Sequence, residues 1–394
     1  MNPASVYRSM ERHSYLRSIP VAAALLLLLL VPAAASAQPT STALLGHPGD
    51  HGSSFDAAFT MSNAVSGNSV LAYRIGSNGL LAPAGNFSTG GTGTGVSLAD
   101  QGSLTLTADH RFLLVVNAGD NTVSVFAVRS GGPVAPLLAL VEVTGSGGVQ
   151  PVSITVHGPL VYVLNAGNGS TAGNIAGFYL GFGGQLFPIP GSVQPLSTVA
   201  PTGPAEIAFN PWGNVLVVTE KDTSLIDAYP VSIWGVARPP VVTVSNGSTP
   251  YGFAFSAGGT LVVSDAGPGA LSSYSVGRNG QIAVVSGSVP DFQAAPCWVE
   301  ISGAYVFTTD AHSNTISTYQ LSWSGALTLL ESSAATTGAA DTDMALGGSH
   351  GQFLLVYDAG AGEIQSFAIG GGATLTLVDT AASLPATAEG LAAF

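Results

Sequence analysis

One pattern recurs seven times along this chain of 394 residues and restricts its fold more than any other feature. Each copy is a short run of mostly apolar residues that ends in Asn, Asp or Glu, and a small-residue turn separates it from a second run that ends near Tyr or Phe. The polar residues follow one another at intervals of 45 to 55 residues: Asn63, Asn117, Asn165, Glu220, Asp265, Asp310 and Asp358. Short strands at this period, with no helical pattern between them, are typical of β-propeller blades, which stack because one small sheet cannot bury both faces alone. The sequence therefore predicts an all-β fold, a seven-bladed β-propeller.

A further short strand precedes six of the seven runs. Its copies begin at equivalent positions, which are Ser103, Ser153, Glu206, Gly252, Trp298 and Asp343. Alternating small and large residues suit the narrow centre of the ring, so we interpret these segments as innermost strands. The first blade lacks such a strand, but Gly390–Phe394 repeats the missing pattern. We therefore predict that the C-terminal strand inserts into the first blade and closes the ring, which leaves no open edge for another chain.

The N-terminal region has the pattern of a targeting segment. Three Arg residues precede an apolar stretch at 21–31, and small residues at 35–37 resemble a cleavage site. We interpret residues 1–37 as a secretory signal peptide, residues 38–54 as a flexible linker rich in Gly, Ser, Thr and Pro, and residues 55–394 as the propeller domain. The apolar stretch is short for a membrane span, and none remains after its removal. The protein is therefore expected outside the cytoplasm, either secreted or periplasmic.

Charge excludes some classes of partner. Without residues 1–37 the chain keeps six basic and 21 acidic residues, and Lys221 is its only lysine. Nucleic acid binding requires clustered Lys and Arg, and the acidic balance also disfavours anionic polymers and membranes as partners. The chain has a single cysteine, Cys297, so no disulfide within the chain is predicted.

The blade sequences Leu114-Val-Val-Asn117-Ala-Gly and Tyr162-Val-Leu-Asn165-Ala-Gly resemble those of seven-bladed propeller lactonases. This family is similar to 6-phosphogluconolactonases of the propeller type and carboxymuconate cyclases, and related YVTN-type repeats occur in secreted proteins. The resemblance covers about residues 55–394. It implies a propeller fold and, for the enzymes of the family, the opening of a lactone.

The segment from Thr202 to Glu220 resembles the most characteristic stretch of these enzymes. Lactone opening requires a base that activates water and a donor near the carbonyl oxygen, where negative charge develops. Glu220 matches the Glu of the enzymes and is the candidate base. Their Arg-His is replaced here by Ala205-Glu206, and a further His and Arg of the enzymes are also missing. These departures favour a propeller that binds a small neutral ligand or an extracytoplasmic protein at a degenerate lactonase site. The alternative is a hydrolase that opens a small neutral, sugar-type lactone with Glu220 as general base.

The starts of innermost strands and the ends of second strands face the same end of a propeller channel, so the candidate residues are expected to converge there. Glu220 and His312 are the candidate catalytic residues. The candidate ligand-binding residues are Glu206, Trp298, Asp310 and Asp343. No cofactor is required, but the oxygen ligands of Glu206 and Asp343 are a candidate Ca²⁺ site at the channel mouth.

Structural roles compete with several of these assignments, although Glu220 is too long for a turn role. The Asn and Asp residues that end the second strands suit tight turns, because their side chains bond to nearby backbone. Trp298 is either a platform for a sugar or a plug that fills the channel. His312 is either an acid or base or an ordinary surface-loop histidine.

Overall fold

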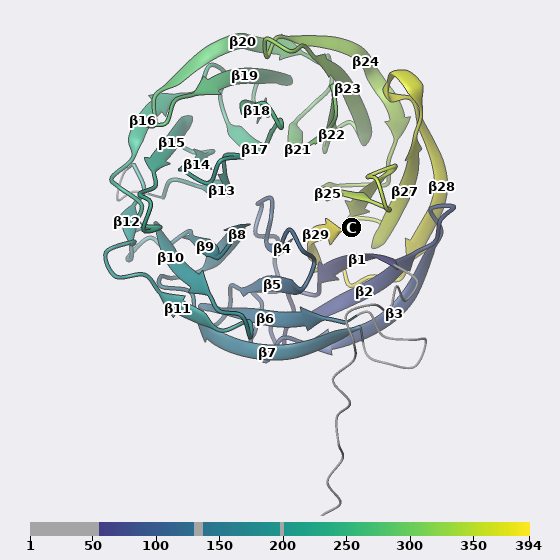
Figure 1. The fold of residues 1–394 in the computed structure, drawn as a ribbon. Coiled ribbons are helices and arrows are strands. Elements are labelled where there is room, and N and C mark those ends of the chain that lie inside the picture. Colours follow the sequence, from purple (N-terminus) through teal and green to yellow (C-terminus); the bar gives the residue numbers. More distant parts are fainter. Residues whose placement is uncertain (1–54, 130–136, 198–200) are drawn as a thin grey trace, which may run out of the picture. The chain divides into compact units, whose positions relative to one another are not determined.

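The computed structural model describes residues 55–129, 137–197 and 201–394, and these belong to one compact unit, His51–Phe394. Seven antiparallel sheets stand as blades around a central channel, with the first strand of each blade innermost (Figure 1). The only helical segment among the described residues is the 3-10 turn η1 (Gly371–Ala373). The predicted signal peptide (1–37) and linker (38–54) lie outside the described residues.

The first three blades contain both chain-end strands and the one irregular sheet. Blade 1 consists of β29 (Glu389–Ala393), β1 (Asp56–Met61), β2 (Ser69–Ile75) and β3 (Leu81–Ser88). Blade 2 consists of β4 (Leu104–Leu106), β5 (Phe112–Asn117), β6 (Thr122–Val128) and β7 (Leu138–Gly145). Blade 3 consists of β8 (Pro151–His157), β9 (Leu160–Asn165), β10 (Asn174–Leu180) and two short outer strands, β11 (Leu186–Pro188) and β12 (Gln194–Pro195).

The other four blades are regular four-stranded sheets. Blade 4 consists of β13 (Pro204–Phe209), β14 (Val215–Glu220), β15 (Leu225–Pro230) and β16 (Val241–Val244). Blade 5 consists of β17 (Pro250–Phe255), β18 (Thr260–Asp265), β19 (Ala270–Val276) and β20 (Ile282–Pro290). Blade 6 consists of β21 (Pro296–Ser302), β22 (Tyr305–Asp310), β23 (Thr315–Leu321) and β24 (Leu327–Thr336). Blade 7 consists of β25 (Asp341–Gly347), β26 (Phe353–Asp358), β27 (Glu363–Ile369) and β28 (Leu375–Ala382).

Strand β29 supplies the innermost strand of blade 1. It pairs antiparallel with β1, and Ala392 lies opposite Phe59. Ala57 and Phe394 exchange main-chain hydrogen bonds of 3.2 and 3.0 Å, and the ring of Phe394 stacks on that of Phe59. The predicted seven blades and the predicted closure by the C-terminal strand are both confirmed.

The second strands form the centre of the apolar core. All six residues of β5, β14 and β26 are buried. A strand covered on both faces by neighbouring blades has no polar side, which is why these sequences are continuously apolar instead of alternating. Large side chains of the third strands, such as Tyr229, Tyr274 and Tyr319, are also fully buried and fill the space between blades.

The antiparallel order of the strands gives the ring two different faces. We call the lower face the one that carries the turns between first and second strands and between third and fourth strands. The upper face carries the turns between second and third strands and the connections from one blade to the next. First strands therefore begin at the upper face and end at the lower face.

Candidate functional site

The start of each first strand lies at the upper end of the channel. In blades 3 to 7 the register between first and second strands shifts at this point. A bulge of this kind re-aims the side chain that follows it. The equivalent residues of the seven blades are Ser103, Ser153, Glu206, Gly252, Trp298, Asp343 and Gly390. Of the three larger side chains in this set, Glu206 and Asp343 line a cavity inside the channel.

The cavity exists because the next layer of the channel is made of small side chains. Alternate residues of a strand point to the same side, so the layer consists of residues two positions further along: Thr105, Thr155, Ala208, Ala254, Glu300, Ala345 and Ala392. The space has a volume of about 390 Å³ and extends to Thr107, Ala108 and His110 near the lower face. Binding pockets for small molecules have volumes of about 300–1,000 Å³. Glu300 is the only large side chain in this layer, and it also lines the cavity.

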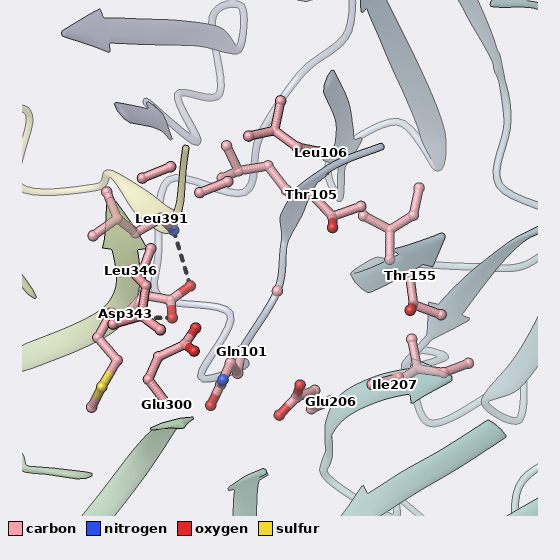
Figure 2. A pocket seen from close by; sticks show the side chains of 18 of the residues that line it. Gln101, Thr105, Leu106, Thr155, Glu206, Ile207, Glu300, Asp343, Leu346 and Leu391 are labelled. Atoms are coloured by element: carbon pink, nitrogen blue, oxygen red, sulfur yellow. Dashed lines mark hydrogen bonds between the residues drawn. The ribbon is translucent and has the colours of Figure 1, made fainter. Parts of the chain in front are cut away.

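Three carboxyl groups share this cavity. Figure 2 shows the side chains of Glu206, Glu300 and Asp343 directed toward one space beside Gln101. Asp343 accepts hydrogen bonds from the main-chain N–H groups of Met344 (2.8 Å) and Leu391 (3.0 Å), which fixes its orientation. The carboxylate of Glu206 accepts a bond of 2.6 Å from the main-chain N–H of Phe253 in the next blade.

Burial shifts the protonation of all three groups in the same direction. It raises the pKa of Glu206 and of Asp343 well above the usual range, and the other carboxyl groups of the cavity add to both shifts. Burial also raises the pKa of Glu300 to about 7. A buried carboxyl group without a cationic partner is more stable in its neutral form. Of the described residues that line the cavity, none is Lys or Arg, so these groups present neutral, protonated oxygens over much of the acidic pH range.

A segment of chain closes the upper end of the channel. We call Leu98–Gly102, in the connection from blade 1 to blade 2, the channel plug, and Figure 1 shows the chain before β4 reaching into the centre of the ring. The main-chain N–H of Gln101 donates to Ala205 in blade 4 (3.0 Å). The indole Nε1 of Trp298 in blade 6 donates to the main-chain oxygen of Asp100 (2.8 Å), and Lys221 donates to the main-chain oxygen of Ala99. The plug, which leaves the ring between blades 1 and 2, is therefore held by main-chain and side-chain contacts with blades 4 and 6.

Asp100 is the one charged side chain of the plug. It is 2% exposed, and neither of its carboxylate oxygens has a hydrogen-bond partner among the described residues. Burial raises its pKa well above the usual range, and nearby Glu389 and Asp343 raise it further, while Lys221 opposes the shift. The plug thus adds Asp100 to the buried carboxyl groups at the upper end of the channel, which also include Glu389, bonded to the main-chain N–H of Leu98 at 3.1 Å.

Two of the candidate residues line a separate pocket on the upper face. This pocket of about 650 Å³ lies between blades 5 and 6, and His312 and Trp298 line it together with Tyr251 and Cys297. His312 is exposed, whereas Trp298 is 4% exposed and packs edge-on against Tyr251 at a ring-centroid distance of 5.2 Å. Trp298 therefore lies beside the channel plug, where it fills space and holds Asp100.

The candidate residues at second-strand ends do not line the channel cavity. Glu220 is fully buried in blade 4, where its carboxylate accepts hydrogen bonds from Ser197 (main chain 3.0 Å, hydroxyl 2.5 Å) and Thr223 (2.6 Å). Asp310 is fully buried in blade 6 and accepts bonds from the hydroxyls of Thr315 (2.9 Å) and Ser317 (2.7 Å). The structure thus separates these two from Glu206 and Asp343, although all four were expected to converge.

Equivalent residues in other blades make similar contacts. The side-chain amide of Asn117 donates to the hydroxyls of Thr122 (3.0 Å) and Ser124 (2.8 Å) on the third strand. Asp265 accepts a bond of 2.5 Å from Ser272, also on the third strand. These polar residues therefore tie second strands to third strands through side-chain hydroxyls, which is a structural role different from the expected bonding to the backbone of a tight turn.

In the part of the chain that the structure describes, the predicted metal site does not coincide with a preformed cluster of metal-ligating side chains. Within residues 55–129, 137–197 and 201–394, no three His, Cys, Asp or Glu side chains are arranged so that they hold a metal ion. Glu206 and Asp343 do share one cavity with Glu300. The prediction of Ca²⁺ binding there stays a prediction.

Sequence reasoning did not select Glu300, Gln101 or Asp100. The signal for Glu300 was present, because it lies two residues after Trp298 in a strand whose alternate side chains face the channel. Gln101 and Asp100 lie in the connection from blade 1 to blade 2, which is longer than the other connections and does not repeat their sequence. No repeat position pointed to them.

Solved structures share this fold at low sequence identity. The periplasmic gluconolactonase of Pseudomonas aeruginosa superimposes with a TM-score of 0.68 at 18% identity, over 86% of this chain and 99% of its own. A protein from Bacteroides fragilis provisionally named a 6-phosphogluconolactonase superimposes with a TM-score of 0.67 at 17% identity, over 88% of this chain and 99% of its own. The sequence matches no family profile and no curated protein.

The expected likeness to lactonase-type propellers is therefore confirmed at the level of the fold. Proteins with other activities share parts of it: hydrazine synthase of Kuenenia stuttgartiensis superimposes with a TM-score of 0.52 at 15% identity, over 73% of this chain and 88% of its own. Function resides in sites placed on a fold, so the reaction of one neighbour does not transfer to another. Among the described residues, none forms a helix long and apolar enough to cross a membrane.

Proposed function

We propose that this protein is a binding propeller that takes up a small neutral polar molecule in its central channel, between the channel plug and the lower face. The observation that carries the proposal is the cavity of about 390 Å³ with Glu206, Glu300 and Asp343 on its wall and no Lys or Arg among its described lining residues. Protonated carboxyl groups donate and accept hydrogen bonds without carrying charge. A polyol or a sugar-like molecule has matching hydroxyl groups.

The charge of the ligand follows from the same cavity. An anionic ligand would meet three acidic groups and, among the described lining residues, no Lys or Arg, so its desolvation would not be offset. A sugar acid or a phosphorylated sugar is therefore excluded as a good ligand, whereas the corresponding neutral sugar or lactone is accepted.

The contacts of Glu220 favour binding over hydrolysis. A general base must reach the water that it activates, within hydrogen-bond distance or through one water molecule. The Glu220 carboxylate is instead buried and bonded to Ser197 and Thr223, and it does not line the cavity. The alternative of a neutral-lactone hydrolase rests on the likeness to lactonase-type propellers and on Glu220 itself.

We also propose that the protein acts outside the cytoplasm, as the pattern of residues 1–37 indicates. A periplasmic gluconolactonase shares its fold, which supports the same location. The neutral ligand would then be drawn from the periplasm or the medium, and a protein partner would be extracytoplasmic as well.

Calorimetric titration with D-glucose, myo-inositol, glucono-δ-lactone and gluconate tests the binding proposal. We expect heat of binding for at least one neutral compound and binding at least tenfold weaker for gluconate. Ala208→Leu places a larger side chain on the cavity wall and should abolish binding while the fold is retained. Gln281→Ala, at an exposed lower-face turn outside the cavity lining, is the matched control that should bind normally. Binding of gluconate in preference to the neutral compounds would contradict the proposal.

An assay of lactone opening distinguishes binding from hydrolysis. Purified protein should not open a panel of neutral lactones faster than buffer does. Hydrolysis that is present in the wild-type protein and lost in Glu220→Gln would establish the alternative function instead.

A further inference from the structure

The basic residues of the propeller lie on one face. Five of the six in the described part of the chain lie in lower-face turns or at strand ends next to them: Arg74, Arg111, Arg129, Arg238 and Arg278. Most of the Asp and Glu residues lie toward the upper end of the ring, where Asp120 and Asp222 are exposed and six others are buried: Asp100, Glu220, Asp265, Asp291, Asp310 and Asp358. The acidic balance of the whole chain therefore does not describe the lower face, and the expectation that anionic surfaces are disfavoured does not apply there.

The lower face also exposes large apolar side chains at the tips of its turns. Trp212, Trp234 and Trp323 are 53%, 72% and fully exposed, whereas the fourth tryptophan, Trp298, is buried. Ile233 and Phe182 are more than nine-tenths exposed, also at lower-face turns. These five side chains come from blades 3, 4 and 6, so several separate turns bring apolar tips to one face.

Arginines accompany these tips around the ring. Arg238 lies on the same turn as Trp234, and Arg278 lies on the equivalent turn of blade 5, between Trp234 and Trp323 in blade order. Arg111 donates from its guanidinium to the main-chain oxygen of Phe182 (3.2 Å). Arg111 lies 3.9 Å from Asp109, but Arg238 and Arg278 have no ion-pair partner among the described residues. Two exposed arginines on this arc therefore keep their full charge for a partner.

We propose that the lower face, from blade 3 to blade 6, docks on a lipid surface that carries anionic headgroups. Tryptophan is favoured at the boundary between headgroups and acyl chains, and an arginine near an anionic surface strengthens binding about fivefold. Exposed aromatic and aliphatic tips on narrow turns insert among lipids, whereas stacking on a polysaccharide requires flat aromatic platforms and gives Ile233 no role. A peripheral protein of this kind lies on the membrane without crossing it.

This docking is separate from ligand binding in the channel. The lower end of the channel opens near His110 and Phe394 in blades 1 and 2, and a second hollow there is also lined by Ser349 and His350 of blade 7. The docking arc lies on blades 3 to 6. Either function therefore remains testable when the other fails.

Tryptophan emission tests the proposal directly in the full chain, because residues 1–54 contain no tryptophan. Vesicles of phosphatidylcholine with phosphatidylglycerol should shift the emission to shorter wavelength, and lipids brominated on their acyl chains should quench it. Vesicles of phosphatidylcholine alone should have a much smaller effect. The apolar stretch at 21–31 is present in every variant, so differences between variants report on the propeller surface.

A tryptophan moved to the other face is the matched control. In a variant with Trp212→Phe, Trp234→Phe and Trp323→Phe, the added substitution Phe292→Trp places the probe at an upper-face position that is 78% exposed. Brominated lipids should quench Trp234 in a variant that keeps it as the only exposed tryptophan, with Trp212→Phe and Trp323→Phe. They should not quench the probe at position 292. Equal quenching of both positions, or of neither, would overturn the proposal.

The charge requirement has its own variants. Arg238→Gln with Arg278→Gln should weaken binding to the anionic vesicles about 25-fold, whereas Arg238→Lys with Arg278→Lys should retain it. Raising the salt concentration should weaken the binding of the wild-type protein to anionic vesicles and should change the binding of the Gln variant little. Emission that shifts with a soluble anionic polysaccharide but not with vesicles would assign the face to a glycan. Dimerisation that disappears in the tryptophan variant would assign it to a second copy of the chain, and either result would overturn docking on lipid.

Discussion

Gln101 and Val299 lie 198 residues apart and are joined by two hydrogen bonds that run in opposite directions. The side-chain Nε2 of Gln101 donates to the main-chain oxygen of Val299 at 3.0 Å, and the main-chain N–H of Val299 donates to Oε1 of Gln101 at 3.1 Å. A side-chain amide thus satisfies backbone groups that a neighbouring strand would otherwise pair. Through this contact, the connection after blade 1 is fastened to the first strand of blade 6.

Replacement of Gln101 by Ala should loosen the channel plug. The buried N–H and C=O of Val299 would lose their partners, and each unsatisfied group costs about 1–3 kcal/mol. We expect a lower free energy of unfolding in chemical denaturation and faster hydrogen exchange at Val299. Gln281→Ala, on an exposed turn, is the control. Equal stability of the two variants would show that the plug does not depend on this contact.

Removal of residues 389–394 should destabilise the whole ring. The deletion takes away β29 and leaves β1 without its inner neighbour. The melting temperature, followed by circular dichroism, should fall sharply, because blade 1 and its contacts with blades 2 and 7 are lost together. Phe394→Ala, which removes the ring contacts with Phe55, Phe59 and His110 but keeps β29, should have an intermediate effect. A truncated chain as stable as the intact one would contradict the role of β29 in closure.

The stability of the protein should decrease as the pH rises through the neutral range. Burial raises the pKa of Asp310 from 3.8 to about 8, with Asp291 adding to the shift, and burial likewise raises the pKa of Asp227 from 3.8 to about 8. Between pH 3.8 and about 8, the folded state therefore binds more protons than the unfolded state. The stabilisation that these two carboxyl groups contribute is fully present below about pH 4 and is lost as the pH rises to about 8.

We expect the melting temperature to be several degrees higher near pH 5 than near pH 8. Asp310→Asn should flatten this dependence, because an amide does not ionise. Asp109→Asn is the matched control: hydrogen bonding to Thr107 lowers the pKa of Asp109 from 3.8, so this variant should leave the dependence between pH 5 and pH 8 unchanged. A melting temperature that rises from pH 5 to pH 8 would contradict the assignment.

Calcium should stabilise the folded protein if Glu206 and Asp343 bind it in the channel. Bound cation stabilises only the folded state, so the melting temperature should rise modestly with Ca²⁺ and not with sodium chloride of equal ionic strength. The variant with Glu206→Ser and Asp343→Ser should lose this response. The same response to both salts would remove the metal-binding prediction.

The fold could be predicted because its signal is repeated. Seven copies of one apolar run, together with a first-strand pattern displaced to Gly390–Phe394, determine both the number of blades and the place of closure. The repeat also placed Glu206 and Asp343 on the channel wall, since equivalent positions of equivalent strands face the same space. The same reasoning places Glu300, two residues after Trp298, on the channel wall, although sequence reasoning did not name it as a candidate.

The parts that sequence did not predict depend on contacts without a repeat. The side chain of Glu220 ends a second strand, as expected, but its direction follows from Ser197 and Thr223, which lie in an irregular connection and a turn. The channel plug depends on partners in blades 4 and 6 that are distant in sequence. Local propensity carries no information about such pairs.

The way in which β29 meets β1 determines how the ring responds to mechanical force. The first residue pair, Ala58 opposite Ala393, lies next to the outer ends of both strands, where Ala57 and Phe394 are bonded to each other. A tension applied between Phe55 and Phe394 therefore pulls the two strands apart in an unzipping geometry. The hydrogen bonds between β1 and β29 break one after another and are not sheared together. Blade 1 should peel open at low force, and the other six blades should stay folded until the tension reaches them.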